Sequence, residues 1–140
     1  MTTPDAFKIA DWDLHRAAVE ERVDVARLLI DRGDDVEAKD GDGCTPLHIA
    51  SWENSVGVVR VLVEHGANVN ATDDDADTPL HMAAWKNSVE VATFLIESGA
   101  DLEARDESDR TPLERANANN FPYAASDEVA RLLENNATTS

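Results

Sequence analysis

The apolar residues of this chain fall in short segments with the three- and four-residue spacing of amphipathic helices. One such segment contains Val58, Val59, Leu62 and Val63, and it ends at Gly66. A shorter apolar segment precedes it, and polar residues typical of a turn separate the two. This pattern predicts two helices joined by a tight turn, followed by a polar loop.

The same pattern returns every 33 residues. A glycine follows the second predicted helix of successive units, at Gly33, Gly66 and Gly99. A fixed period of this length is typical of small units that stack side by side, each contacting only its neighbours. Such a stack forms a long surface and not an enclosed catalytic cavity. We expect one domain over residues 1–140, with units at about 7–39, 40–72, 73–105 and 106–137.

Each regular unit begins with residues that favour a turn and then a helix start. Asp40-Gly41-Asp42-Gly43 is a turn sequence, because glycine reaches positive φ freely and Asp bonds its own backbone. Thr45 then lies where a helix N-cap belongs, and Pro46 takes the first helical position, where no amide is needed. The equivalent pairs are Thr78-Pro79 and Thr111-Pro112. Thr111 and Glu114 also match a reciprocal capping box.

The turn between the two helices of a unit has its own signals. Asn54 follows the first helix of the second unit, and Asn tolerates the left-handed conformation that ends a helix. Ser55 comes next and is the expected N-cap of the second helix. Asn87 and Ser88 repeat this pair in the third unit. We therefore expect the same turn in both units.

The terminal units depart from the regular pattern. Asp13 stands where the proline of the other units lies. The last unit carries an insertion near Asn119 to Ala125, whose aromatic residues either form a recognition loop or cover the open end of the stack. Phe7, Ile9 and Trp12 are expected to cover the other end. Terminal repeats are expected to deviate, because one side of each faces solvent.

The repeat resembles the ankyrin repeat, which has a 33-residue period and a Thr-Pro-Leu-His-x-Ala signature. The matching segments are Thr45 to Ala50 and Thr78 to Ala83, and the resemblance covers roughly residues 11 to 136. It implies a mainly α fold, an ankyrin-type solenoid in which each of four stacked repeats is a β-hairpin followed by an α-hairpin. It also implies that His48 and His81 connect hairpin and helix through hydrogen bonds.

The resemblance further implies that partners meet the hairpin tips and the concave face formed by the first helices. Trp52 and Trp85 lie at equivalent places there, in a column with Val19 and Ala118. They are expected to form an aromatic patch, since large rigid rings dominate interface energetics. In the alternative interpretation each indole only covers apolar surface of the next repeat. The other candidate contacts are Glu53, Lys86, Asp42, Cys44, Asp75, Asp77 and Arg110.

Charge restricts the class of partner. The chain has 12 basic and 29 acidic side chains, a formal net charge of −17, which repels nucleic acid and anionic membranes. We therefore expect a protein partner with a basic patch, although acidic hairpins that only aid solubility would look the same. No apolar run approaches the roughly 18 residues of a membrane span, and the N-terminus resembles no secretory signal. A cytoplasmic monomer is expected.

Metal and thiol chemistry find little support in the sequence. The acidic turns that begin at Asp40 and Asp73 invite a calcium interpretation, but the twelfth position, which should be Glu, is Ser51 or Ala84. Cys44 and His48 stand four residues apart, as in a thiol dyad, yet the histidine recurs as His81 without a cysteine. We find no cofactor motif and expect none to bind.

The sequence thus predicts a non-catalytic module that binds another protein. A narrower alternative is an acidic inhibitor or immunity-type protein that masks a basic active site. An alternative of another class is a metal-binding or thiol enzyme that uses Cys44 and His48. A fourth is a scaffold unit with no partner of its own.

Overall fold

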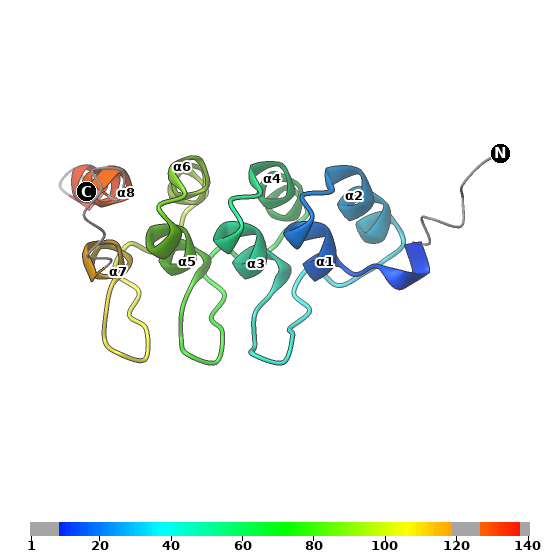
Figure 1. Ribbon diagram of the computed structural model, residues 1–140, viewed down its shortest axis with the longest axis horizontal. Helices are drawn as coiled ribbons and strands as arrows, with labels where there is room; N and C mark the ends of the chain where they lie inside the picture. The colour runs from blue at the N-terminus through cyan, green and yellow to red at the C-terminus, as the bar shows by residue number, and fades with distance from the viewer. Residues whose placement is uncertain (1–8, 119–126, 138–140) are drawn as a thin grey trace.

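The computed structural model describes residues 9–118 and 127–137. Over these residues the chain forms eight α-helices and one 3-10 helix, and no strand is present (Figure 1). In chain order the elements are η2 (Ile9–Asp11), α1 (Leu14–Val19), α2 (Val23–Asp31), α3 (Pro46–Trp52), α4 (Val56–Glu64), α5 (Pro79–Lys86), α6 (Val89–Glu97), α7 (Pro112–Ala118) and α8 (Asp127–Ala137).

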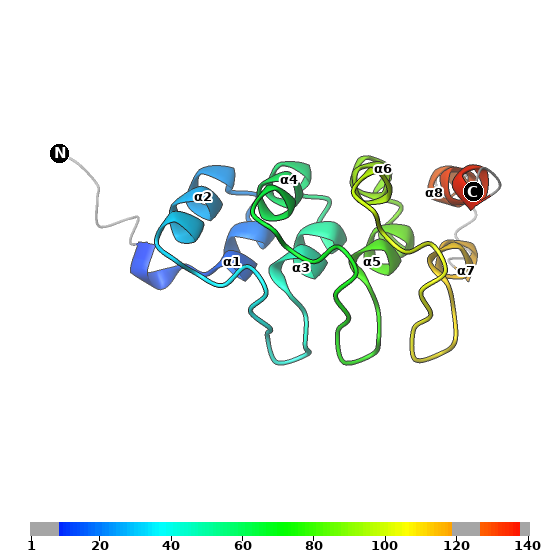
Figure 2. The same cartoon turned by 180° about the vertical axis from the view of Figure 1, so that it is seen from behind.

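The helices form two rows in an elongated stack. One row consists of α1, α3, α5 and α7, and the other of α2, α4, α6 and α8 (Figures 1 and 2). The loops before α3, α5 and α7, which we call the second, third and fourth hairpins, project together from the first row. The predicted mainly α repeat stack is confirmed. The described part of each hairpin is built from turns and not from β-strands.

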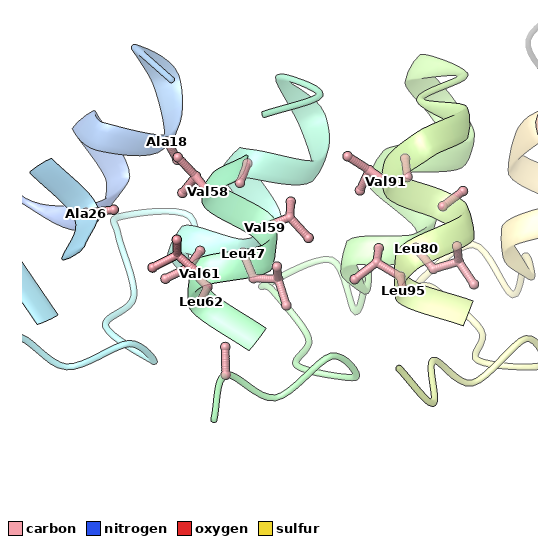
Figure 3. Packing of buried hydrophobic residues seen from close by; sticks show 14 of the residues in the cluster. Ala18, Ala26, Leu47, Val58, Val59, Val61, Leu62, Leu80, Val91 and Leu95 are labelled. Atoms are coloured by element: carbon pink, nitrogen blue, oxygen red, sulfur yellow. The ribbon is translucent and has the colours of Figure 1, made fainter. Parts of the chain in front are cut away.

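Columns of equivalent apolar residues form a continuous core (Figure 3). Leu62 and Leu95 are fully buried in the second row, and Leu47 and Leu80 are buried in the first. Burying a leucine side chain contributes about 1.5–3 kcal/mol to stability. Alanine recurs among these leucines because a small side chain lets neighbouring helices pack closely. The fully buried alanines include Ala17, Ala50 and Ala83.

The predicted helix starts of the first row are present. The hydroxyl of Thr45 accepts a hydrogen bond from the amide of His48, and the imidazole of His48 accepts one from the amide of Thr45. This is a reciprocal capping box in which histidine takes the place of glutamate. In the fourth repeat Thr111 and Glu114 form the capping box that the sequence predicts, with both bonds at 3.2 Å.

The turn between paired helices is confirmed in position but differs in chemistry. Asn54 and Asn87 have positive φ, at 57° and 55°. Ser55 precedes α4, as expected of an N-cap, but its side chain makes no capping hydrogen bond. Its hydroxyl instead donates to the carbonyl oxygen of Ala18, 2.6 Å away in the preceding repeat. Ser55 is therefore the N-cap residue of α4, as predicted, but its hydroxyl bonds to the preceding repeat, where a buried acceptor lies within its reach.

The N-terminal repeat replaces the Thr-Pro start with a different cap. Asp13 is the N-cap of α1, and its carboxylate accepts a hydrogen bond of 2.8 Å from the amide of Arg16. Trp12 is buried in the core cluster, and Ile9 packs against that cluster. Phe7 and the insertion from Asn119 to Ala125 lie outside the described residues.

Candidate interaction surface

Each hairpin is closed by one aspartate at its start. An oxygen of Asp40 accepts hydrogen bonds from the amides of Asp42 and Cys44, at 2.8 and 3.0 Å. Asp73 and Asp106 repeat this arrangement in the third and fourth hairpins. These carboxylates are therefore structural, as the turn chemistry predicted. The acidic residues at the turns remain exposed: Asp42, Asp74, Asp75, Glu107 and Asp109.

Buried histidines connect the second repeat to the third and the third repeat to the fourth. His48 accepts from the amide of Thr45 at Nδ1, so Nε2 carries the proton and donates to the carbonyl oxygen of Asp77, 2.8 Å away. His81 makes the same contact with the carbonyl of Arg110, also at 2.8 Å. Burial lowers the pKa of both imidazoles, so they are neutral near neutral pH. With both nitrogens engaged, these histidines serve the fold.

Trp52 and Trp85 lie at the ends of α3 and α5, and both are partly exposed. The Nζ atom of Lys86 lies 4.7 Å from the ring centroid of Trp52, and Cζ of Arg115 lies 4.4 Å from that of Trp85. Each indole therefore makes a cation–π contact with the following repeat. The contact holds the ring against its neighbour and leaves part of it accessible to solvent.

The other predicted contact residues fall into two groups. Glu53, Lys86, Asp42 and Asp75 are exposed, and Arg110 is partly exposed. The end members of the tryptophan column, Val19 and Ala118, are exposed as well. In contrast, Cys44 and Asp77 are buried, so these two side chains offer a partner little surface.

The buried thiol of Cys44 is poorly suited to catalysis. Burial and the nearby carboxylates raise its pKa to about 12, so it stays protonated near neutral pH. Its Sγ atom donates to Oδ2 of Asp73 at 3.7 Å, while the imidazole of His48 is occupied by backbone groups. A thiolate–imidazole pair is therefore absent here, which contradicts a thiol enzyme built on Cys44 and His48.

Sequence reasoning missed a group of charged residues between the third and fourth repeats. Oδ2 of Asp106 lies 3.4 Å from Nε of Arg110 and 3.7 Å from Nη1 of Arg115, and Nη2 of Arg115 lies 3.9 Å from Asp77. A signal existed in the repeat itself: Cys44, Asp77 and Arg110 occupy one column, so a neutral residue is replaced first by an acid and then by a base.

Comparison with known protein families agrees with this architecture. A family model described as ankyrin repeats (3 copies) matches residues 14–106 and 72–139. The chain is an ankyrin repeat protein. Ankyrin repeats are generally protein–protein interaction modules and are usually non-catalytic. No curated protein matches the chain significantly. Among the described residues, none of the helices of this ankyrin repeat protein has the length and apolar character needed to cross a membrane.

Proposed function

We propose that this ankyrin repeat protein is a non-catalytic module that binds a partner with a basic surface through its concave face and hairpin tips. The observation that carries the proposal is the pair of partly exposed indoles of Trp52 and Trp85, which occupy equivalent places in adjacent repeats. Trp is among the residues that most often dominate the energy of protein interfaces.

The cations beside the two indoles support a role in binding. Lys86 and Arg115 hold the rings against the next repeat, so a partner would meet aromatic surfaces that are already ordered. An ordered ring loses little conformational entropy when a partner docks on it. The two indoles are therefore suited to receive an aliphatic or aromatic side chain of the partner.

Charge supports a basic partner. The exposed residues of the hairpin turns are mostly acidic, and the chain as a whole has a formal net charge of −17. Complementary charge accelerates association and excludes acidic competitors, and salt screens it over about 10 Å at 0.1 M. We therefore expect capture of the partner to weaken as salt concentration rises.

The proposal is tested by replacing Trp52 and Trp85 together with alanine and using the intact chain for affinity capture. Loss of an interface hot spot costs at least ~2 kcal/mol of binding free energy, so the affinity for the partner should fall by roughly thirtyfold or more and capture should be lost. Thermal unfolding should change little, since both rings are partly exposed.

Phe94→Ala is the matched control. Phe94 is also a partly buried aromatic residue with a cation over its ring, Arg60 at 5.0 Å, but it lies on α6 in the other row of helices. The control should retain capture. Full capture by the double tryptophan variant, or a large loss of its thermal stability, would show that the indoles are part of the fold and not of an interface.

The same acidic surface suits an inhibitor or immunity-type protein that masks a basic active site. Addition of the ankyrin repeat protein to its captured partner distinguishes the two roles, because an inhibitor abolishes the partner's activity at a one-to-one ratio. We also propose a cytoplasmic location, since a single cysteine, Cys44, cannot form an intrachain disulfide and suits a reducing compartment.

A further inference from the structure

Two carboxyl groups meet in the interior at the junction between the third and fourth repeats. Asp77 and Asp106 are only 6% and 7% exposed, so both carboxyls are removed from bulk water. One oxygen of each lies, with a ring nitrogen of His81, in a group whose members are all within 4.8 Å of one another. Oδ1 of Asp77 and Oδ2 of Asp106 are buried and have no hydrogen-bond partner.

The charged neighbours of this pair come from every element around it. Arg110 and Arg115 lie at ion-pair distance from Asp106, and Arg115 also from Asp77, yet neither guanidinium donates a hydrogen bond to the two orphan oxygens. Leaving a buried oxygen without a donor destabilises the folded state. The other titratable groups around the pair are Asp73 and Asp75 of the third hairpin, Glu107 of the fourth, His48 of α3 and His81 of α5.

The junction between the second and third repeats shows which chemical group is needed at the position of Asp77. One repeat earlier, Cys44 occupies the place of Asp77, and Asp73 occupies the place of Asp106. There the neutral thiol of Cys44 donates to the carboxylate of Asp73 at 3.7 Å. A carboxyl group at position 77 provides the equivalent donor only when it is protonated.

We propose that Asp77 and Asp106 bind one shared proton, with the Asp77 carboxyl as donor and the Asp106 carboxylate as acceptor, so that acidification tightens this junction. The orphan oxygens are enclosed by protein, and a proton is small enough to reach them without rearrangement. A metal ion would meet the positive charge of Arg115 and a His81 ring whose nitrogens already serve backbone groups.

The electrostatics of the two carboxyls assign the proton to Asp77. Burial raises the pKa of Asp77 to about 6, and the charges of Asp73 and Asp106 add to the rise, against the opposing effect of Arg115. Burial also raises the pKa of Asp106, but the amides of Arg110 and Ser108 and the charge of Arg110 lower it below its ordinary value overall. Asp106 is therefore ionised wherever Asp77 titrates.

The raised pKa of Asp77 determines how the stability of the fold changes with pH. A folded-state pKa above the unfolded value stabilises the fold at low pH, and that stabilisation is lost as pH rises through the folded pKa. For Asp77, whose pKa rises from 3.8 to about 6, the loss occurs between about pH 4 and pH 7. Its upper limit is roughly a hundredfold in the folding equilibrium constant, since each pKa unit corresponds to tenfold.

The first test is a pH titration of the intact chain in which NMR monitors the chemical shifts of the side-chain carboxyl carbons. We expect the resonance of Asp77 to titrate near pH 6, well above those of the exposed aspartates. A midpoint below about 4.5 would overturn the proposal, because Asp77 would then be ionised throughout the range in which it should release the shared proton.

Asp77→Asn provides the second measurement, because an amide donates to Asp106 without titrating. At about pH 7.5 this variant should unfold with an equilibrium constant at least tenfold smaller than the wild-type value, with slower amide exchange in α7 and α8. The difference should narrow as pH falls and vanish near pH 3.5, where Asp77 is protonated in both the folded and the unfolded chain. The control is Asp74→Asn, which removes one exposed charge from the same hairpin, away from the pair, and should show no such pH-dependent difference. An Asp77→Asn variant that is destabilised equally at both pH values would instead show an ordinary ion pair with Arg115.

Discussion

His48 shows how one side chain serves two repeats at once. Its imidazole closes the capping box of its own helix α3 and also donates to the carbonyl oxygen of Asp77, 29 residues further along the chain. The residue is fully buried, so each of these hydrogen bonds forms away from competing water. The sequence signature indicated the first contact, and the second exists only because neighbouring repeats are stacked.

Replacing His48 with alanine should therefore destabilise the fold strongly. The change leaves the buried amide of Thr45 without its acceptor and removes one of the two hydrogen bonds to the carbonyl of Asp77, which keeps the one from the amide of Asp73. Because a buried side chain is lost as well, we expect a loss of about 2–4 kcal/mol in the free energy of unfolding. Urea denaturation near pH 7.5 measures it. The exposed His65 is the control, and His65→Ala should lie within about 0.5 kcal/mol of wild type. Equal effects of the two changes would contradict the role given to His48.

The pH dependence of His48 runs opposite to that of Asp77. Burial lowers its pKa, so the unfolded chain takes up a proton before the folded chain does. The contribution of the neutral His48 to stability is therefore fully present above its ordinary pKa of 6.5, and it is lost as pH falls below that value. In His48→Gln, which cannot titrate, we expect a smaller loss of stability between about pH 7 and pH 5 than in wild type. Urea midpoints across this range provide the comparison, and an unchanged pH profile would contradict a neutral buried imidazole.

At the scale of elements, the hairpins depend on side-chain oxygens where a β-ladder would use only backbone groups. The carboxylate of Asp73 accepts from the amides of Asp75 and Asp77, both at 2.9 Å, and its other oxygen accepts from the thiol of Cys44. Adjacent hairpins are further joined by backbone bonds, such as the amide of Asp74 to the carbonyl of Asp42 at 3.1 Å. This explains why loops without described strands still align in a row (Figure 2).

Asp73→Ala should consequently weaken the third hairpin. Two amides and one thiol lose their acceptor, and we expect a loss of about 1–3 kcal/mol with faster amide exchange at Asp75 and Asp77. Hydrogen exchange followed by NMR detects this change. Asp74→Ala is the matched control, because Asp74 is an exposed neighbour of the same charge and its loss should change stability by no more than about 0.5 kcal/mol. Unchanged exchange in Asp73→Ala would show that the backbone alone holds the hairpin.

At the scale of the whole molecule, the repeats form a one-dimensional stack in which each repeat contacts only its neighbours. Leu62 lies in the second repeat, between two neighbours, whereas Leu133 on α8 lies in the last repeat. Both leucines are buried. The same leucine-to-alanine substitution at the two positions should therefore affect the stack differently.

Leu62→Ala should lower the stability of the entire stack by about 2–5 kcal/mol, a large part of the 5–15 kcal/mol typical of a domain. Leu133→Ala should mainly release α7 and α8 while α1 to α4 stay protected. Hydrogen exchange resolved by peptide distinguishes the two patterns. Uniform loss of protection in both variants would mean that the four repeats unfold as one cooperative unit.

The sequence alone determined the period, because equivalent residues return every 33 positions. It also determined the helix pairs, the caps at Thr45 and Thr111 and the ends at Asn54 and Gly66, because each of these depends on residues a few positions apart. The stacked structure decided the rest. Ser55 bonds to the preceding repeat and not to its own helix, Lys86 covers Trp52, and Asp77 faces Asp106. Such contacts join residues about one repeat apart, and their geometry depends on how closely neighbouring repeats pack. The packing distance between repeats cannot be predicted from a pattern of residues that are near one another in the sequence.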